Sequence, residues 1–282
     1  MKRTLRSKEG VRLQVSEQTA PKRWSFSTRL HLHPRFHSCF LPDDRDVTVY
    51  LPPHYDENVD REYPVLYVQD GQNLFELETA FESGRTWQFA ESVDAAILAG
   101  EVEPLIVVGI ANAGERRLAE YTPTSDWKLG GGQADKYGRL LTEELLPFIA
   151  ARYRVRPGAA NTGLGGSSLG GLATLCLGLQ FEEVFGKLAV LSPSVWWNHR
   201  AILSLVTEAT PRLRGRSRIW LDVGDAEGQR AVADADLLAR RLKAKGWRPS
   251  IDLSYERIAG GTHDEASWAQ RVRPMLRFLY PA

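Results

Sequence analysis

The sequence predicts a single α/β domain in which a mostly parallel central sheet carries helices on both faces. Strand-like and helix-like segments alternate along most of the 282 residues, which is the pattern of doubly wound sheets. Several of the strand-like segments are continuous apolar runs, as expected for strands buried on both faces of a parallel sheet. A glycine-rich segment, 161–175, predicts a strand, a sharp turn and the start of a helix.

The predicted elements begin with two strands, 28–33 and 46–51, whose alternation of apolar and polar residues indicates an antiparallel pair. Buried strands are expected at 63–69 and 105–110, and further strands at 186–192, 217–223 and 251–257, in addition to the strand of the glycine-rich segment. Helices are expected at 87–99, at 134–153, from the glycine-rich segment to about 179, at 229–246 and at 265–279. A long polar connection, 111–132, ends in three glycines, and loops of this length inside a compact domain are usually functional.

Composition and charge are those of an ordinary globular protein. The hydrophobic fraction is 43% and the charged fraction 25%, so the chain can form a large core without a disulfide or a metal. The net charge of +1 argues against a nucleic-acid partner, because such proteins usually carry a strong basic excess. No stretch approaches the ~20 apolar residues of a membrane span, and no apolar run follows the basic N-terminus as in a signal peptide. We therefore expect a cytoplasmic protein without a membrane partner; the sequence predicts no oligomeric state.

The residues Gly166-Ser167-Ser168-Leu169-Gly170 match the pattern G-x-S-x-G between a predicted strand and helix. In this context the pattern is the nucleophile elbow of α/β-hydrolases. Glycine flanks the serine because so sharp a turn leaves no room for a Cβ atom on either side. Ser167 is excluded because Leu169, not glycine, lies two places after it. We therefore predict Ser168 as a nucleophile at a helix N-terminus, which favours negative charge.

A serine nucleophile needs a base, and His263 occupies the expected position. In this fold the base follows the last strand, and His263 lies between the last predicted strand and the last predicted helix. The spacing of His31, His33 and His37 could suit a metal. We expect surface or packing histidines there instead, and we expect no metal and no organic cofactor.

The acid of the triad is expected directly after the strand 217–223, where three carboxylates compete. Asp222 lies within the strand end, from which it would point into the sheet or pair locally. Asp225 suits a turn or a helix cap as well as a catalytic role. Glu227 lies on a loop long enough to reach the histidine, and we favour it over Asp225.

Two backbone amides are expected to stabilise the oxyanion of a tetrahedral intermediate. One is the amide of Leu169, directly after the nucleophile. The second should come from the loop after the third strand, where Gly71 lets the chain turn so that the amide of Gln72 faces the site. A plain turn is the alternative interpretation of Asp70-Gly71.

Motifs that agree with this assignment are spread from about Arg45 to Trp268. They are Tyr63–Phe75 (YPVLYVQDGQNLF), Arg117–Tyr121 (RLAEY), Gly166–Gly171 (GSSLGG), Ser192–Trp197 (SPSVWW) and Gly260–His263 (GGTH), with Trp268 after the last. In this set and order the chain resembles an esterase family of the α/β-hydrolases. That family contains the catalytic domains of enterochelin esterases, the feruloyl esterases and esterase D.

The resemblance implies roles for individual residues. It implies Ser168 as the nucleophile and His263 as the base. Because many members carry a glutamate after the turn at Gly224, it also implies Glu227 as the acid. The amide of Gln72 would be the second oxyanion donor.

The resemblance also suggests residues that bind substrate. Arg117 looks like an arginine of enterochelin-esterase-like proteins that would meet an acidic or catecholate substrate; a solvated arginine beside Arg116 is the alternative. Trp196 and Trp197 resemble an aromatic pair near the site, with core packing expected for at least one of them. The chain departs from enterochelin esterases at its N-terminus, where residues 1–24, a polar extension or an edge strand, leave no room for their separate N-terminal domain.

We therefore expect residues 25–282 to form an α/β-hydrolase catalytic domain that hydrolyses a small-molecule carboxylic ester through an acyl-enzyme. A siderophore, aromatic-acid or acyl-sugar ester would suit the resemblance. Acyl transfer to an alcohol or a sugar is one alternative, because it would use the same residues. A non-catalytic binding protein on the same fold is another, although binding alone requires no serine, histidine and carboxylate in this arrangement.

Overall fold

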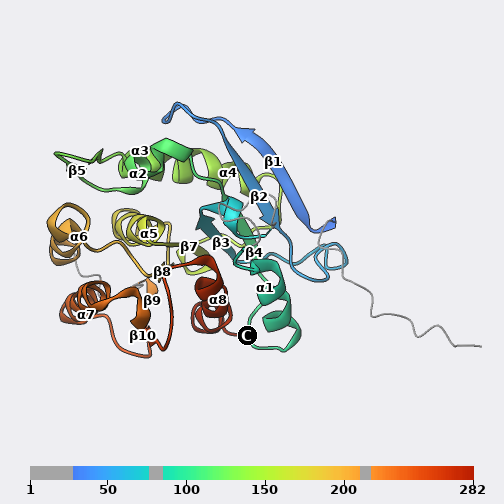
Figure 1. Ribbon diagram of the computed structural model, residues 1–282. Coiled ribbons are helices and arrows are strands. Elements are labelled where there is room, and N and C mark those ends of the chain that lie inside the picture. The colour runs from blue at the N-terminus through green and yellow to red at the C-terminus, as the bar shows by residue number, and fades with distance from the viewer. Residues whose placement is uncertain (1–27, 76–84, 210–216) are drawn as a thin grey trace, which may run out of the picture.

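The computed structural model describes residues 28–75, 85–209 and 217–282 (Figure 1). The predicted boundary between residues 1–24 and 25–282 therefore lies outside the described residues. The strands of the described chain are β1 Leu30–Phe36, β2 Arg45–Tyr50, β3 Val65–Gln69, β4 Ile106–Ile110, β5 Ser125–Asp126, β6 Gly130–Gly131, β7 Thr162–Ser167, β8 Lys187–Leu191, β9 Arg218–Gly224 and β10 Leu253–Ile258. Its α-helices are α1 Phe89–Leu98, α2 Arg117–Tyr121, α3 Ala134–Arg139, α4 Leu146–Ala150, α5 Leu169–Gln180, α6 Trp197–Glu208, α7 Gln229–Ala244 and α8 Glu265–Leu279.

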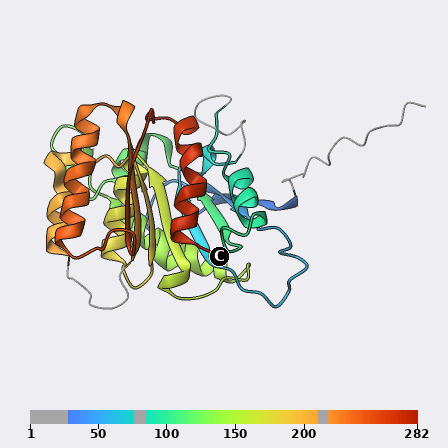
Figure 2. The same ribbon diagram turned by 90° about the horizontal axis from the view of Figure 1, so that it is seen from below.

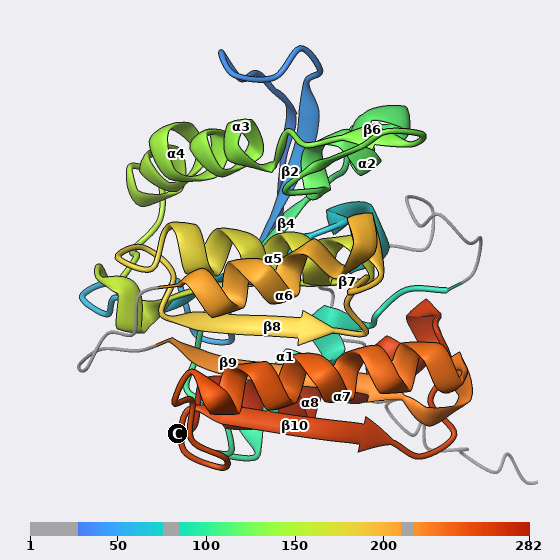
Figure 3. The same ribbon diagram turned by 90° about the vertical axis from the view of Figure 1, so that its left-hand side faces the viewer.

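Eight of the strands form one sheet in the order β1-β2-β4-β3-β7-β8-β9-β10. The pairs β1–β2 and β2–β4 are antiparallel, and all other neighbours are parallel. Figure 3 shows β8 and β10 running in the same direction. The carboxyl ends of the parallel strands therefore meet at one edge of the sheet, which is where open α/β sheets bind their ligands.

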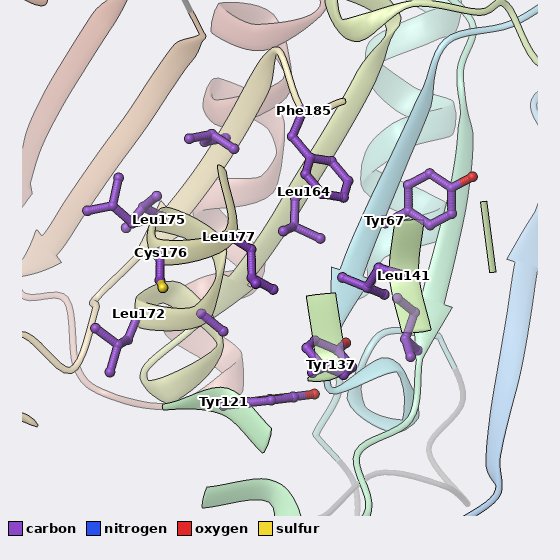
Figure 4. Close-up of a cluster of buried hydrophobic side chains, with 14 of the residues drawn as sticks. Tyr67, Tyr121, Tyr137, Leu141, Leu164, Leu172, Leu175, Cys176, Leu177 and Phe185 are labelled. Carbon is purple, nitrogen blue, oxygen red and sulfur yellow. The ribbon is translucent and has the colours of Figure 1, made fainter. Parts of the chain in front are cut away.

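Helices cover both faces of this sheet (Figure 2). Helices α1 and α8 pack with one apolar cluster, and α3 to α7 pack with another on the opposite face. Figure 4 shows part of the second cluster, in which Leu177 of α5 lies near Leu164 of β7. The predicted fold class is confirmed: the central sheet is mostly parallel and carries helices on both faces.

The described elements differ from the sequence prediction at three places. The helix expected over 134–153 is divided into α3, a π-helical segment Leu140–Leu145, and α4. The connection 111–132 is structured, because it contains α2 and the small hairpin of β5 and β6. Helix α6 was not predicted. After its first residue, Trp197, it has Asn198, His199 and Arg200 in left-handed backbone conformations, so no ordinary helix-start signal precedes its apolar face.

Within the described ranges, none of the helices combines the length and the apolar character needed to cross a lipid bilayer.

Candidate active site

Ser168 lies at the sharp turn between β7 and α5, next to the middle of the sheet. Its backbone is at φ 58° and ψ −121°, a conformation that costs free energy for any residue other than glycine. Neighbouring backbone holds it there: the amide of Ser168 donates to Leu191 O (3.0 Å), and the amide of Ser194 donates to Ser168 O (3.0 Å). The end of β8 and the segment that follows it therefore hold the turn in this strained conformation.

The glycines of the turn have unequal roles. A Cβ atom at Gly166 would lie 2.4 Å from Gln69 Oε1, and one at Gly171 would lie 2.8 Å from Leu191 O. A Cβ atom at Gly170 would have its nearest neighbours at 3.4 Å, an ordinary contact. Space therefore requires glycine before the serine and at Gly171, rather than at both positions of the G-x-S-x-G pattern.

His263 and Ser168 line the same cavity, of about 570 Å³. The imidazole Nδ1 of His263 lies 2.7 Å from Glu227 Oε2, so a proton on Nδ1 would be shared with the carboxylate and Nε2 would be left as an acceptor. The hydroxyl of Ser168 lies 3.3 Å from the hydroxyl of Ser194. Among the described residues, the Ser194 hydroxyl is the side-chain hydrogen-bond partner of the Ser168 hydroxyl. Ser168 is therefore not hydrogen-bonded to the imidazole of His263 in this conformation.

Glu227 is buried, and donors surround its second carboxylate oxygen. Oε1 accepts hydrogen bonds from Ser192 Oγ (2.5 Å), from the amide of Gly224 (2.7 Å) and from Arg271 Nη2 (3.3 Å). Burial raises the pKa of the Glu227 carboxyl, but the bonds from His263, Ser192 and Gly224 outweigh it and hold that pKa below its ordinary value. Glu227 is therefore ionised at neutral pH and accepts from the imidazole.

The two competing carboxylates are engaged elsewhere. Asp225 Oδ1 accepts from the amide of Gly260 (2.7 Å), so this side chain ties the loop after β9 to the loop before His263. Asp222 is fully buried and accepts from Trp220 Nε1 (2.7 Å). The structure brings Glu227, and neither aspartate, to the imidazole.

The turn after β3 has a different origin from the one expected. Asp70, at φ 56°, takes the left-handed conformation, whereas Gly71 has no positive φ. Glycine is needed at 71 because a Cβ atom there would lie 2.4 Å from the β4 backbone at Gly109 and Ile110. Gln72 lines the same cavity as Ser168, and Leu169 is the first residue of α5, where helix amides lack an acceptor within the helix.

Arg117 is not a solvated arginine. Its Nε and Nη2 atoms donate to the two carboxylate oxygens of Asp70 at 2.7 and 2.8 Å, and its guanidinium lies 5.2 Å from the ring centroid of Tyr121. Burial lowers the pKa of Arg117, but the bonds and charge of Asp70 outweigh it and place that pKa above its usual value. Arg117 therefore lines the cavity as part of a fixed ion pair.

The two tryptophans have separate environments. Trp197 is 1% exposed and belongs to the apolar core, and its Nε1 donates to Thr124 O (3.0 Å). Trp196 is 45% exposed and lines a second cavity, of about 350 Å³, together with Ser168 and His263. The expectation of core packing for one of the pair holds for Trp197.

Two residues at the site were missed from the sequence. Ser192 has φ 42° and donates to Glu227, and the fully buried Arg271 of α8 bonds both of them. The signal for Arg271 is its position on the apolar face of α8, between Trp268 and Val272, which are buried. A charged residue in an apolar stripe has to find a buried partner.

The described N-terminal histidines hold no metal site. His31 Nδ1 and His33 Nε2 lie 3.3 and 2.7 Å from the hydroxyl of Tyr153, and His37 Nδ1 lies 2.8 Å from Asp44. Across the residues that the structure describes, no group of three histidine, cysteine or carboxylate side chains could hold a metal ion.

Known proteins resemble this chain in sequence and in fold. The family model described as "Putative esterase" matches residues 38–279. The chain is 28% identical over 256 residues to the uncharacterized protein YbbA of Bacillus subtilis (strain 168), covering 84% of this chain and 93% of the relative. It is 29% identical over 240 residues to the iron(III) salmochelin esterase of Escherichia coli O6:H1, covering 79% of this chain and 51% of that enzyme. The structure of the BES protein from Bacillus cereus is similar with a TM-score of 0.72 and 21% identity, covering 99% of this chain and all of that one.

Proposed function

The chain belongs to the esterase family whose model it matches, and is thus a carboxylic ester hydrolase; we propose that it acts through an acyl-enzyme formed on Ser168. The observation that supports this proposal most is the contact between His263 Nδ1 and Glu227 Oε2 (2.7 Å) beside a cavity that Ser168 also lines. A serine, an imidazole and a buried carboxylate in this order are the groups that activate a serine hydroxyl.

The proposed reaction begins with rotation of the Ser168 hydroxyl away from Ser194. Oγ then attacks the ester carbonyl carbon while its proton passes to Nε2 of His263. The imidazolium formed is stabilised by Glu227, which stays ionised. When the tetrahedral intermediate collapses, the C–O bond to the alcohol breaks and Nε2 returns the proton to the leaving oxygen. Water repeats these steps on the acyl-enzyme and releases the carboxylic acid.

The amides of Leu169 and Gln72 are the proposed donors to the oxyanion. Leu169 follows the nucleophile at the start of α5, and Gln72 lies beyond the close contact of Gly71 with β4. Each such donor supplies roughly 3–4 kcal/mol of transition-state stabilisation in serine hydrolases.

Two cavities beside the triad support an ester with two unlike parts. The larger is lined by charged and amide groups, among them Asp70, Arg117 and Glu265. The smaller is lined by as many apolar side chains as polar ones, and the apolar ones include Trp196 and Val195. We propose a charged or hydrogen-bonding part of the substrate beside Asp70 and Arg117 in the first cavity and an aromatic part against the exposed Trp196 in the second, which suits siderophore and aromatic-acid esters more than a plain alkyl ester.

The exposure of His263 supports hydrolysis over acyl transfer. Its side chain is 45% exposed, so water can reach the imidazole that would activate it. A transferase has to keep water from the acyl-enzyme. We therefore propose water as the acceptor.

We also propose that the protein acts on small molecules in the cytoplasm, without nucleic acid or membrane. The net charge of +1 supports the first part, and the two cysteines, both unpaired, suit a reducing compartment. Fractionation of cells that express the chain, probed with an antibody, tests the location.

A panel of p-nitrophenyl and aromatic-acid esters, measured with three forms of the protein, tests the proposal. Wild type and Ser167→Ala should hydrolyse the same esters, because Ser167 is the last residue of β7 and not the nucleophile. Ser168→Ala should lose at least about 10³-fold in kcat. Equal activity of the wild type and Ser168→Ala would refute the mechanism, and faster transfer to an added alcohol than to water would favour the acyltransferase.

A further inference from the structure

Arg271 is a buried cation directly behind the proposed catalytic acid. It projects from α8, is 1% exposed, and its Nη1 lies 2.9 Å from Asp222 Oδ1 and 2.7 Å from Ser192 Oγ. Its Nη2 lies 3.3 Å from Glu227 Oε1. One guanidinium therefore contacts two of the three carboxylates at the end of β9, Asp222 and Glu227.

The same guanidinium also holds the segment that carries the base. Arg271 Nη2 donates to Thr262 O (2.9 Å) and to Ser267 Oγ (2.8 Å). Thr262 immediately precedes His263. Arg271 thus connects the loop of the acid with the loop of the base, which come from different strands.

Stability alone is a poor explanation for this residue. A buried ion pair usually contributes no more than apolar side chains of the same volume would. In addition, Nε of Arg271 is buried without a partner among the described residues, which costs free energy.

Asp222 fits the cluster as a charged group. Burial raises the pKa of its carboxyl above the ordinary value, although Arg271, Trp220 and the amide of Ser192 act against that change. All three of these neighbours donate, at 2.9, 2.7 and 3.2 Å. The ionised carboxylate can accept every one of these bonds, whereas a protonated carboxyl would present a donor to donors.

The charges behind His263 therefore sum to −1, from Asp222, Glu227 and Arg271. Without Arg271 the imidazole would face two negative charges, and without the charge of Asp222 it would face none in sum. Two carboxylates would favour the protonated imidazole, whose Nε2 cannot accept a proton from the serine.

We propose that Arg271 and Asp222 are positioning residues that set the charge facing His263, so that the imidazole is free to act as a base near neutral pH. The proposal rests on the proposed function, because it concerns the same base. Neither residue contacts the reacting atoms.

Other charged groups around the triad are paired or are left unchanged by the test. Within the described ranges they are Asp225 on the loop after β9, Asp264 at the start of α8 with the charge of Arg85 near it, Glu265 beside Asn73, the pair of Asp70 with Arg117 on the side of the larger cavity, and the pair of Asp234 with Arg200 on the side of the smaller.

The test is the pH dependence of kcat/KM for p-nitrophenyl butyrate in Arg271→Met, Asp222→Asn and the double variant. Arg271→Met removes a positive charge, so the acid-side midpoint of the profile should move up by about one pH unit. Asp222→Asn removes a negative charge, so the midpoint should move down by a similar amount. The double variant keeps a sum of −1 and should return close to the wild-type midpoint.

Matched controls separate this effect from loss of structure. Arg273→Met makes the same substitution two residues away on α8, where the arginine is partly exposed and donates to Glu101 at 2.8 Å through two nitrogens. Its midpoint should not move. Arg271→Lys keeps the charge without the fork of donors, so it should keep the midpoint even if kcat falls.

The outcomes distinguish the two proposals. Inactive wild type that a fluorophosphonate does not label would remove the proposed function. Active wild type with equal midpoints in all variants, or with both single variants shifted in the same direction, would overturn the role of Arg271 and Asp222 alone. If Arg271→Met fails to fold by circular dichroism, Asp222→Asn and Arg271→Lys still decide the question, because the proposal requires a downward shift in one and no shift in the other.

Discussion

Each oxygen of the Glu227 carboxylate has a different task. Oε2 accepts from His263 at 2.7 Å, and Oε1 is held by Ser192 and by the amide of Gly224. The acid is therefore fixed by contacts that do not involve the imidazole, and its orientation does not depend on the state of the base. Asp225, two residues earlier, makes a bond to backbone instead.

The pair Glu227→Gln and Asp225→Asn tests this difference. Glu227→Gln should lower kcat/KM by about 10³–10⁴-fold, because an amide neither fixes the tautomer of His263 nor stabilises its cation. Asp225→Asn should cost less than about tenfold, since an amide oxygen can still accept from Gly260. Steady-state kinetics with p-nitrophenyl butyrate measure both, and a larger loss in Asp225→Asn would overturn the choice of acid.

Trp196 and Trp197 offer a second matched pair of residues. Trp197→Ala should reduce the free energy of unfolding by roughly 3–5 kcal/mol, because it empties a core position. Trp196→Ala should leave the midpoint of urea unfolding almost unchanged and should raise KM for aromatic-acid esters more than for acetyl esters. Equal KM ratios in wild type and Trp196→Ala would exclude a substrate contact.

At the scale of elements, the contact between the turn after β3 and strand β4 positions the proposed oxyanion donor. Gly71 touches the β4 backbone so closely that no Cβ atom fits, and Gln72 follows immediately. The position of this amide relative to Ser168 is therefore set by the pairing of β3 with β4 on one side and with β7, the strand before Ser168, on the other.

Gly71→Ala should consequently lower both stability and activity. Overpacking against backbone costs about 1–3 kcal/mol, and displacement of the Gln72 amide should lower kcat by ten- to a hundredfold. Gly100→Ala is the control: φ is +69° there but nothing lies within 4 Å, so a similar strain of about 1 kcal/mol should leave kcat unchanged. Urea unfolding and steady-state kinetics of both variants measure these effects. An unchanged kcat in Gly71→Ala would show that this turn has no role in catalysis.

At the scale of the whole molecule, a buried lysine lies at the start of β8, the end away from the proposed active site, and contacts residues near the C-terminus. Lys187 Nζ lies 3.8 Å from Glu103 Oε1 and 3.9 Å from the ring centroid of Tyr280. Burial lowers the pKa of Lys187 to about 8, and the charge of Glu103 offsets only part of this change. Below that pH both the folded and the unfolded chain carry the proton, so burial of the charged lysine lowers the free energy of unfolding by its full amount.

Between about pH 8 and the ordinary lysine value near 10.5, the unfolded chain binds a proton that the folded chain does not, so the contribution of Lys187 to stability rises with pH. The free energy of unfolding of the wild type should therefore rise relative to that of Lys187→Met by on the order of 2 kcal/mol across this window. Urea unfolding of both proteins at about pH 7, 9 and 10.5 measures the difference. If the difference in the free energy of unfolding between the two proteins does not change with pH, burial of the protonated lysine does not destabilise the folded chain.

The alternation of strands and helices was sufficient to predict the fold class, because apolar runs mark buried parallel strands. The same local patterns could not predict α6, whose first turn is held by Asn198 Nδ2 bonding Thr124 Oγ1 and Ser125 O of a distant hairpin. Arg271 was missed for the same reason: apart from Ser267 on its own helix, its partners come from β9, from the turns directly after β8 and β9, and from the loop before α8, and such contacts exist only in the folded chain. The motifs led to the positions of Ser168, His263 and Glu227, which remain predictions until their chemistry is measured.

Mass spectrometry of the protein quenched in acid during turnover of p-nitrophenyl butyrate tests the central claim most directly. We predict one butyryl group per chain, on Ser168, that disappears when substrate is exhausted and is absent from Ser168→Ala. Rapid hydrolysis with no acylated serine, or a butyryl group on Ser194 instead of Ser168, would contradict the account.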